Sequence, residues 1–549
     1  MDSPFASRLG SNYCPTDDEV LEIREFIAEP KRQILALDNE IAQLRETIEK
    51  LEEKRKSLNP YVEAHQALIS PMRRIPQDVL SEIFIACLPT HRNCVMSASE
   101  APLLLGRICS SWRALSLATP RLWASLHVVE RSLTHEVRTI RLGAIKMWLG
   151  RAGRCPLSIS LYSDNYVPSP QSTGDTETDM QTLTDSFIKD LVLFADRWQH
   201  VRFIAARNVI QEITHLTPND TPMLESVAFS VQPDYPRGDL RWSDFEMLKS
   251  PGISSFSTTS SEFQVSIPLH WHLLTELCIG GSGWESTLDA ETALATLARC
   301  PMLQVCKLAV NVLSASPRHP TVELPHLHTL HLDFGNLSSL LLDRLHAPEL
   351  RKFLFRGHVE FLPLFLGSCG GLETLDIDGS SLVKSSLMES LRILPTTMRH
   401  LTIRDHPRPR PGPMGTARPT TLLDDDVLAL LIRVPDLDSS GHTSSQCCCP
   451  QLESLTTLGG EMSDFALQNF IEGRMVAGST GPFLKHVRVQ FSRAMKLDIK
   501  SSLKRFVDTG LDLELLYLPP PLPVYGSPWE GLQDAPSPWG PTWTLPVYW

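Results

Sequence analysis

The 549-residue sequence lacks long apolar runs and an excess of basic residues. Its longest apolar runs, such as 103–105 and 191–195, are far shorter than the roughly 18 residues that cross a bilayer. The N-terminus also lacks the basic and then apolar segments of a secretory signal. Asp and Glu (63) outnumber Lys and Arg (51), and a net charge of −12 disfavours binding to phosphate backbones. We therefore expect an intracellular protein, cytoplasmic or nuclear, with no membrane and no nucleic acid as partner.

Glycine is scarce relative to proline, with 29 glycines against 42 prolines, which reverses normal usage. The 12 cysteines are spread along the chain, as reduced thiols rather than a disulfide framework would be. Catalytic motifs are missing as well: there is no Walker sequence, no complete zincin motif and no nucleophile elbow. The adjacent cysteines Cys447, Cys448 and Cys449 have no partner pair at zinc-ligand spacing. We expect no enzyme activity, no cofactor and no metal.

Heptad spacing is present near the N-terminus, in a segment predicted to be a coiled coil over 31–59. The apolar residues of its seam are Ile34, Leu37, Ile41, Leu44, Ile48, Leu51 and Leu58. Isoleucine occupies the a positions and leucine the d positions, and Arg55 interrupts one a position. Pro30 and Pro60 are expected to bound the helix. The seam favours either pairing with another coiled coil, with a homodimer as one form, or a helix folded back on its own domain.

Three short helices are predicted between residues 65 and 127. The first starts at Pro76, carries its apolar residues along one face, and ends at Pro89. After the polar residues 90–101, a second apolar segment holds Cys109 and Trp112 and continues to residue 123. A small helical core follows from this pattern.

Four short motifs in this region resemble, in order, those of the F-box in the version common in fungal F-box proteins. They are Ile75-Pro76, Ile83-Phe84, Cys109-x-x-Trp112 and Leu122-Trp123. The family has Leu-Pro where this sequence has Ile-Pro, and residues 90–101 lengthen the connection between the first two helices. The resemblance implies docking on the Skp adaptor, which links an F-box protein to a cullin ligase. Carried over to this sequence, the adaptor-binding candidates are Pro76, Val79, Leu80, Ile83, Phe84 and Trp112. The alternative is that the same residues form only a helical core.

Beyond about residue 150 a pattern of Pro-x-Leu-x-x-Leu-x-Leu recurs with apolar substitutes. Its first apolar positions are Leu224, Leu274, Leu303, Leu327, Leu350, Leu372, Met398, Leu452 and Leu484. From Leu274 to Met398 the spacing is 22 to 29 residues, the range of leucine-rich repeats. Each unit predicts a short strand, and segments such as 294–298 and 387–394 predict helices between strands. Stacked units would share one core and form an irregular solenoid over 140–518.

Alternation along the predicted strands indicates which side chains leave the core. If Leu330 and Leu332 point inward, His331 and Asp333 point outward onto the inner curve of the solenoid. Together with their equivalents in neighbouring strands, the substrate-binding candidates are His331, Asp333, Arg356, Asp376, Asp378 and Arg404. This face is expected either to bind a protein substrate or to be an ordinary solvated sheet.

The predicted architecture is α/β and has five segments. They are an N-terminal segment (1–30), a coiled-coil helix (31–59), a three-helix F-box (65–127), a leucine-rich-repeat-like solenoid (140–518) and a Pro/Trp-rich tail (519–549). The function that this order favours is the substrate-recognition subunit of a Skp–cullin–F-box ubiquitin ligase, with catalysis in other subunits. The alternative is a protein-interaction scaffold that uses the coiled coil and repeats without a ligase.

Overall fold

The structure is a computed structural model. It describes residues 3–69, 71–130, 135–163, 188–231, 241–259, 267–280, 288–311, 320–334, 341–356, 362–378, 382, 384–405, 423–432, 448–475 and 484–518. The chain divides into two compact units, Met1–Ala86 and Cys87–Trp549. The tail predicted at 519–549 lies outside the described residues.

The first unit is dominated by the 52-residue helix α1 (Asp17–Leu68), which follows the short 3-10 helix η1 (Ala6–Arg8). Thr16 and Glu19 form a capping box that starts α1 well before Pro30. The predicted bounds at Pro30 and Pro60 were therefore wrong, since both prolines lie inside the helix. A proline removes one backbone donor, and the long runs of good helix formers on both sides offset this cost. The unit ends with η2 (Pro71–Arg74) and α2 (Gln77–Ala86).

The second unit contains a 15-stranded sheet whose paired strands all run parallel. Its strands are β1 (Ser125–Glu130), β2 (Leu157–Ser163), β3 (Trp198–Ala205), β4 (Ser226–Val231), β5 (Ser255–Thr258), β6 (Glu276–Ile279), β7 (Leu288–Asp289), β8 (Val305–Asn311), β10 (Thr329–Phe334), β12 (Lys352–Arg356), β13 (Thr374–Asp378), β14 (His400–Arg404), β15 (Ser454–Gly460), β16 (His486–Phe491) and β17 (Asp512–Leu516). A separate two-stranded sheet pairs β9 (Val322–Glu323) with β11 (Leu345–His346). Along the large sheet the strands follow one another in chain order, as stacked repeats require.

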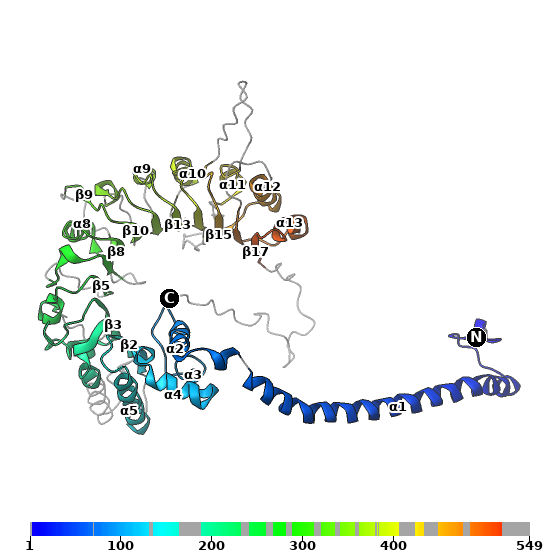
Figure 1. Ribbon diagram of the computed structural model, residues 1–549. Helices are drawn as coiled ribbons and strands as arrows, with labels where there is room; N and C mark the ends of the chain where they lie inside the picture. Colours follow the sequence, from blue (N-terminus) through cyan, green and yellow to red (C-terminus); the bar gives the residue numbers. More distant parts are fainter. Residues whose placement is uncertain are drawn as a thin grey trace, which may run out of the picture. The chain divides into compact units, whose positions relative to one another are not determined.

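Helices connect the strands and lie on the outer side of the curve, while the strands line its inner side (Figure 1). The helices of the second unit whose bounds lie within the described residues are α3 (Leu105–Ile108), α4 (Ser110–Ala118), α5 (His135–Arg151), α7 (Arg207–Gln211), α8 (Ala290–Leu297), α9 (Leu362–Ser368), α10 (Lys384–Ile393), α11 (Asp425–Ala429), α12 (Asp464–Met475) and α13 (Lys500–Val507), and residues 188–192 are helical as well. Its 3-10 helices are η3 (Pro120–Trp123), η4 (Ala195–Arg197), η5 (Trp242–Asp244), η6 (Glu246–Lys249), η7 (Trp271–Leu273) and η8 (Leu342–Arg344). The helices predicted at 294–298 and 387–394 are confirmed by α8 and α10. In the part of the chain that the structure describes, no helix is long and apolar enough to cross a bilayer.

The core explains the repeat motif. In the repeat that contains β10, three leucines are fully buried: Leu327, the first leucine of the motif, and the strand residues Leu330 and Leu332. The same three positions are buried in the repeats of β12 and β13. Each strand therefore contributes two apolar side chains to a core that continues from repeat to repeat, and the leading leucine of the motif adds a third.

Residues 90–101, which lengthen the predicted F-box, lie along the first edge of the sheet. Val95 forms a parallel bridge with His127 of β1. The side-chain amide of Asn93 accepts hydrogen bonds from Ser125 (2.9 Å) and Ser158 (2.8 Å) and donates one to Ser160 (3.0 Å). Because Asn93 reaches both β1 and β2, this segment covers the edge strand and ties the following helices to the sheet. The sheet thus begins at Ser125, earlier than the predicted start at residue 140.

Candidate functional site

The inner face of the sheet brings the predicted substrate-binding residues together in two rows. In the first row, Lys307, His331, Leu354, Asp376, Thr402, Thr456 and Arg488 are successive partners across the strands from β8 to β16. In the second row, the successive partners are Asp333, Arg356, Asp378, Arg404, Leu458 and Gln490. The predicted alternation of buried and outward-facing residues is confirmed in β12, β13 and β14. We refer to Lys307, His331, Asp333, Arg356, Asp376, Asp378 and Arg404 as the inner-face cluster.

Arg404 and Asp376 form the best-defined ion pair of the inner-face cluster. The guanidinium donates through Nε to Oδ1 (2.9 Å) and through Nη2 to Oδ2 (2.6 Å) of Asp376. The pair runs diagonally from β14 to β13, and the two side chains are 31% and 17% exposed. This two-pronged geometry holds both planar groups in place better than a single contact would. The cluster as a whole balances three cations against three carboxylates, so it presents both charge signs on a rigid frame.

His331 lies in the first row between Lys307 and Leu354. Its Nε2 atom is buried and has no hydrogen-bond partner among the described residues. Burial lowers the pKa of His331 to about 4; the charges of Lys307 and Arg356 act in the same direction, and Asp376 opposes them. The imidazole is therefore neutral near pH 7 and keeps one buried ring nitrogen without a hydrogen-bond partner among the described residues.

Replacing His331 with asparagine is expected to flatten the acid side of the stability profile. The folded pKa of about 4 lies below the ordinary value of 6.5. Between these values the unfolded chain binds a proton that the folded chain does not, so stability falls as the pH drops through this window. Between pH 7 and pH 5 the free energy of unfolding should therefore fall by about 1 kcal/mol less in the variant than in the parent, after allowance for partial solvent screening. Urea unfolding at both pH values measures the difference, and equal losses in both proteins would contradict the prediction.

The inner face extends beyond the residues that sequence reasoning selected. At one end, Arg488 of β16 pairs with Glu514 of β17 at 3.1 Å between Nε and Oε2. At the other end, His127 of β1 lies 2.9 Å from the hydroxyl of Ser160, which is in register with Arg202 of β3. Arg488 lies on β16, which the repeat motif predicts, and alternation already places it among the outward-facing residues. Glu514, His127, Ser160 and Arg202 lie on strands for which no copy of the motif was identified. Within the described residues, no group of three or more His, Cys, Asp or Glu side chains is placed to hold a metal ion.

The adaptor-binding candidates on α2 separate into two classes by exposure. Leu80 is 6% and Phe84 0% exposed, so neither can be a direct contact in this conformation, and both belong to the core. Val79 and Ile83 are 47% and 38% exposed, one helical turn apart, and Pro76 at the start of the helix is also exposed. Helix α2 therefore buries one pair of apolar residues and leaves the adjacent pair in solvent.

Trp112, the remaining adaptor-binding candidate, lies half-buried on α4. The spacing Cys-x-x-Trp has a structural cause, because Cys109 is the N-cap of α4 and its sulfur accepts from the backbone N–H of Trp112 at 3.4 Å. The last motif pair is structural too. Trp123 is 2% exposed, donates its indole N–H to the Ser116 carbonyl (2.9 Å) and packs edge-on against Trp148. Most of the motif residues in the second unit thus build the helices or their core.

Comparisons with known proteins give no family for this chain. No family model matches it, and no curated protein matches it. Among solved structures it is similar to a chain in the crystal structure of the Rad7 and Elc1 complex in yeast, with 12% identity, a TM-score of 0.35, and coverage of 79% of this chain and 96% of that chain. It is also similar to a protein of Bacteroides fragilis (12% identity, TM-score 0.26, coverage of 56% and 68%) and to a chain of the TLR13–ssRNA13 complex (11%, 0.22, 55% and 47%). TM-scores this low leave the fold to be judged from the chain's own strands and helices.

Proposed function

We propose that the protein is the substrate-recognition subunit of a Skp–cullin–F-box ubiquitin ligase. In this role α2 and the following helices bind a Skp adaptor, the inner face of the sheet binds a protein substrate, and the catalytic groups belong to other subunits. The order of motifs in residues 75–123 supports the assignment, because it resembles that of the F-box. The assignment requires an apolar surface that is free to meet the adaptor.

The exposure of Val79 and Ile83 is the observation that carries this proposal. Both are β-branched apolar side chains on one side of α2, and both remain substantially in solvent while Leu80 and Phe84 are buried. Burying such a pair against a partner removes apolar surface from water, and this stabilises the complex by about 25 cal/mol for each Å² of apolar surface buried. Exposed apolar side chains that lie side by side on one helix can form part of the apolar core of a subunit interface, which is depleted in charged residues.

The inner-face cluster supports the substrate side of the proposal. Its charges are fixed on a continuous parallel sheet, and ion pairs such as Arg404 with Asp376 hold the side chains in position. A segment of a substrate that carries charges of both signs would match this pattern. The contribution of the protein to ubiquitin transfer would be proximity, since a held substrate lysine reaches the charged ubiquitin carrier at a high effective concentration.

The docking test uses the full chain and a fungal Skp adaptor. The double variant Val79→Lys/Ile83→Lys places two charges on the exposed pair of α2 without touching Leu80 or Phe84. We expect the dissociation constant for the adaptor to rise by about 20-fold or more, because both lysines would have to lose water in an apolar interface. Isothermal titration calorimetry measures the change.

A matched control exists on α5, where Val137 and Ile140 are 46% and 73% exposed. The variant Val137→Lys/Ile140→Lys makes the same two substitutions away from α2 and should bind the adaptor as the parent does. Unchanged thermal unfolding of both variants shows that the fold is kept. If the parent chain does not bind the adaptor, or if the α2 variant binds normally, the ligase role is wrong and an interaction scaffold becomes the better description.

A further inference from the structure

Helix α1 exposes a much longer seam than the predicted coiled coil. Because the helix passes through Pro30 and Pro60, the same heptad register extends to both sides. Its a positions are Val20, Ile27, Ile34, Ile41, Ile48, Arg55 and Val62, and its apolar d positions include Ile23, Leu37, Leu44, Leu51 and Leu58. Between residues 34 and 58 the apolar seam residues are 45% to 61% exposed. A helix of 52 residues is roughly 78 Å long, and an apolar stripe along much of it is a strong association surface.

We propose that α1 pairs in parallel and in register with α1 of a second copy of this chain. Isoleucine at a and leucine at d is the combination that favours two parallel strands over higher oligomers. Pairing would bury the seam of each copy against an identical seam. The inference concerns α1 alone and goes beyond the proposed ligase function, which it neither needs nor supports.

The charges beside the seam favour the parallel arrangement. In a parallel pair, residue g of one helix faces residue e of the next heptad in the other, which sets Glu40 against Arg45 of the second copy. The remaining g-to-e pairs between residues 33 and 59 contain no like charges. The g-to-e contacts of the parallel pair are therefore free of repulsion between residues 33 and 59, and its one like-charge contact is Arg55 against Arg55 of the second copy at an a position.

The antiparallel pair that overlaps residues 34–58 fully is less favourable. It sets Arg45 against Arg45, and it sets Asp38 against Glu52 twice. Its attractive contact, Glu40 with Lys54, also occurs twice and does not offset the three like-charge contacts. Contacts between like charges destabilise a helix pair, so charge complementarity favours the parallel form.

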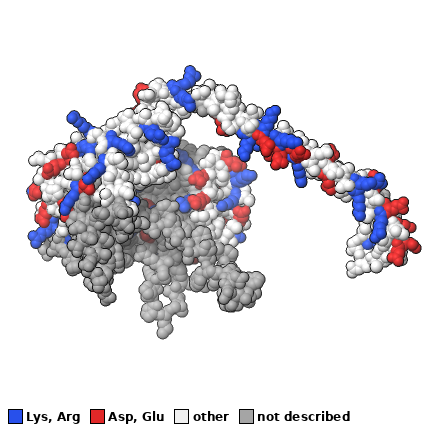
Figure 2. All heavy atoms as spheres, turned by 90° about the horizontal axis from the view of Figure 1, so that it is seen from below, with Lys and Arg blue, Asp and Glu red and all other residues white. Residues whose placement is uncertain are grey.

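The ion pairs within α1 are compatible with this use of Glu40 and Arg45. Arg32 bonds Glu29, and Lys50 bonds Glu46. All four residues occupy c and f positions, on the face away from the seam. Side chains of both signs stand along the length of the helix in Figure 2. The outer face is thus stabilised within one helix.

The first test is the mass of the full chain in solution, measured by sedimentation equilibrium. The monomer mass is 61.4 kDa, and we expect twice this value for the parent at micromolar concentration. The variant Leu37→Lys/Leu44→Lys charges two d positions and should raise the dissociation constant of the dimer by about 100-fold or more. The matched control is Leu21→Lys/Leu35→Lys, because these leucines are 62% and 63% exposed in the same helix but occupy b positions. It should remain dimeric.

The second test distinguishes the two orientations by charge exchange. Glu40→Lys alone should weaken the dimer, since it sets lysine against arginine twice. Adding Arg45→Glu restores an opposite-charge pair only in the parallel form. In the antiparallel form it replaces the repulsion between two arginines with repulsion between two carboxylates and restores nothing.

Recovery of the parent dissociation constant in the double variant is the expected result. A monomeric parent, a seam variant that stays dimeric, or a double variant that stays weak would each overturn the proposal. Unchanged thermal unfolding of the sheet unit confirms that the variants are folded.

Discussion

Replacing Arg474 with methionine is expected to lower the free energy of unfolding by about 3–5 kcal/mol. Arg474 is in the last turn of α12 and is 1% exposed. Its guanidinium donates to three backbone carbonyl oxygens: Leu431 (2.8 Å), Cys449 (3.0 Å) and Cys448 (3.0 Å). Methionine preserves most of the side-chain volume but removes the charged donor. The three carbonyl oxygens then stay buried without a partner, and an unsatisfied buried acceptor costs more free energy than a hydrogen bond normally contributes.

The positions of the three carbonyls explain why the effect should be large. Leu431 follows α11, whereas Cys448 and Cys449 lead into β15, so Arg474 joins the two ends of an insertion in the repeat. Cys449 has a positive φ of 54°, an unfavourable backbone conformation for this residue that its surroundings must hold. Without the guanidinium we expect the segment before β15 to detach first, and β15 to lose hydrogen-exchange protection with it.

Urea unfolding of the full chain measures this change, and Arg505→Met is the matched control. Arg505 is on the adjacent helix α13, its side chain is 64% exposed, and it pairs with Glu472 at 3.4 Å. An exposed pair of this kind contributes little, so the control should lose less than about 1 kcal/mol. Similar losses in the two variants would show that Arg474 does not hold the segment.

The repeat motif predicted nine strands because each repeat is stabilised mainly by burying apolar side chains at three positions, which leucine often occupies. The motif missed β3 and β5 although the spacing is the same there. Their leading positions are Trp198 and Ile253, which are 0% and 2% exposed, and the strand positions of β3 are Val201 and Phe203. Any apolar side chain of suitable size can fill such a site, so even a pattern that admits some apolar substitutes is too narrow.

The long helix shows the opposite error. The pattern predicts a helix that begins after Pro30 and ends before Pro60, yet the penalty of one lost hydrogen bond is local, whereas the helix propensity of α1 is summed over 52 residues. The capping box of Thr16 with Glu19 was the available signal for the true start. In the candidate site, alternation predicted the rows of the inner face, but no pattern could predict that Arg404 reaches diagonally to Asp376, because this depends on side-chain length and strand twist.

The irregular end of the sheet was beyond sequence reasoning for a related reason. Between β15 and β16 the register shifts at Gly459, whose φ is +91°. A Cβ atom there would lie 1.8 Å from the carbonyl oxygen of Asp405. Only glycine fits this position, but nothing in the repeat pattern marks one glycine of 29 as the site of a close backbone approach.

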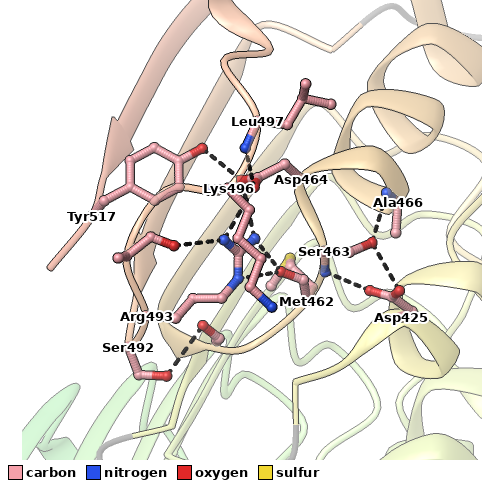
Figure 3. A network of polar contacts seen from close by, with 12 residues as sticks. Asp425, Met462, Ser463, Asp464, Ala466, Ser492, Arg493, Lys496, Leu497 and Tyr517 are labelled. Atoms are coloured by element: carbon pink, nitrogen blue, oxygen red, sulfur yellow. Dashed lines mark hydrogen bonds and ion pairs between the residues drawn. The ribbon is translucent and has the colours of Figure 1, made fainter. Parts of the chain in front are cut away.

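Replacing Asp464 with asparagine is expected to cost about 3–4 kcal/mol of folding free energy. Asp464 is the first residue of α12, is 3% exposed, and is the centre of the polar network in Figure 3. Its carboxylate accepts from Arg493, from the hydroxyl of Tyr517 (2.9 Å), and from the backbone N–H groups of Lys496 (3.1 Å) and Leu497 (3.0 Å). The network therefore ties α12 to the segment after β16 and to the end of β17.

Asparagine is nearly the same shape but has the wrong chemistry for this site. All the partners of Asp464 are donors, so one of the two carboxylate oxygens would be replaced by an NH₂ group that faces other donors. The variant also removes the negative charge opposite Arg493, which is held in place by stacking on Phe491 (4.5 Å) and by donating to the Met462 carbonyl (2.6 Å). The Arg493 guanidinium, which is only 13% exposed, loses its counter-charge, and this accounts for a large part of the expected loss.

The pH dependence of stability separates this explanation from a simple packing defect. Burial by itself would raise the pKa of Asp464, but the hydrogen bonds from Arg493, Tyr517 and the backbone outweigh it and hold the pKa below the ordinary value. The stabilisation is thus present above pH about 4 and is lost as the pH falls through the folded pKa. Urea unfolding from pH 7 to pH 3 should show a smaller acid loss in Asp464→Asn than in the parent.

The matched control for this pH dependence is Asp498→Asn. Asp498 is exposed and accepts from the backbone N–H of Lys500 (3.0 Å). Because the side-chain oxygen of asparagine can accept the same hydrogen bond, the control should keep the stability of the parent at pH 7. An acid loss in Asp464→Asn that equals the loss in the parent would mean that the carboxylate is not what holds this end of the sheet together.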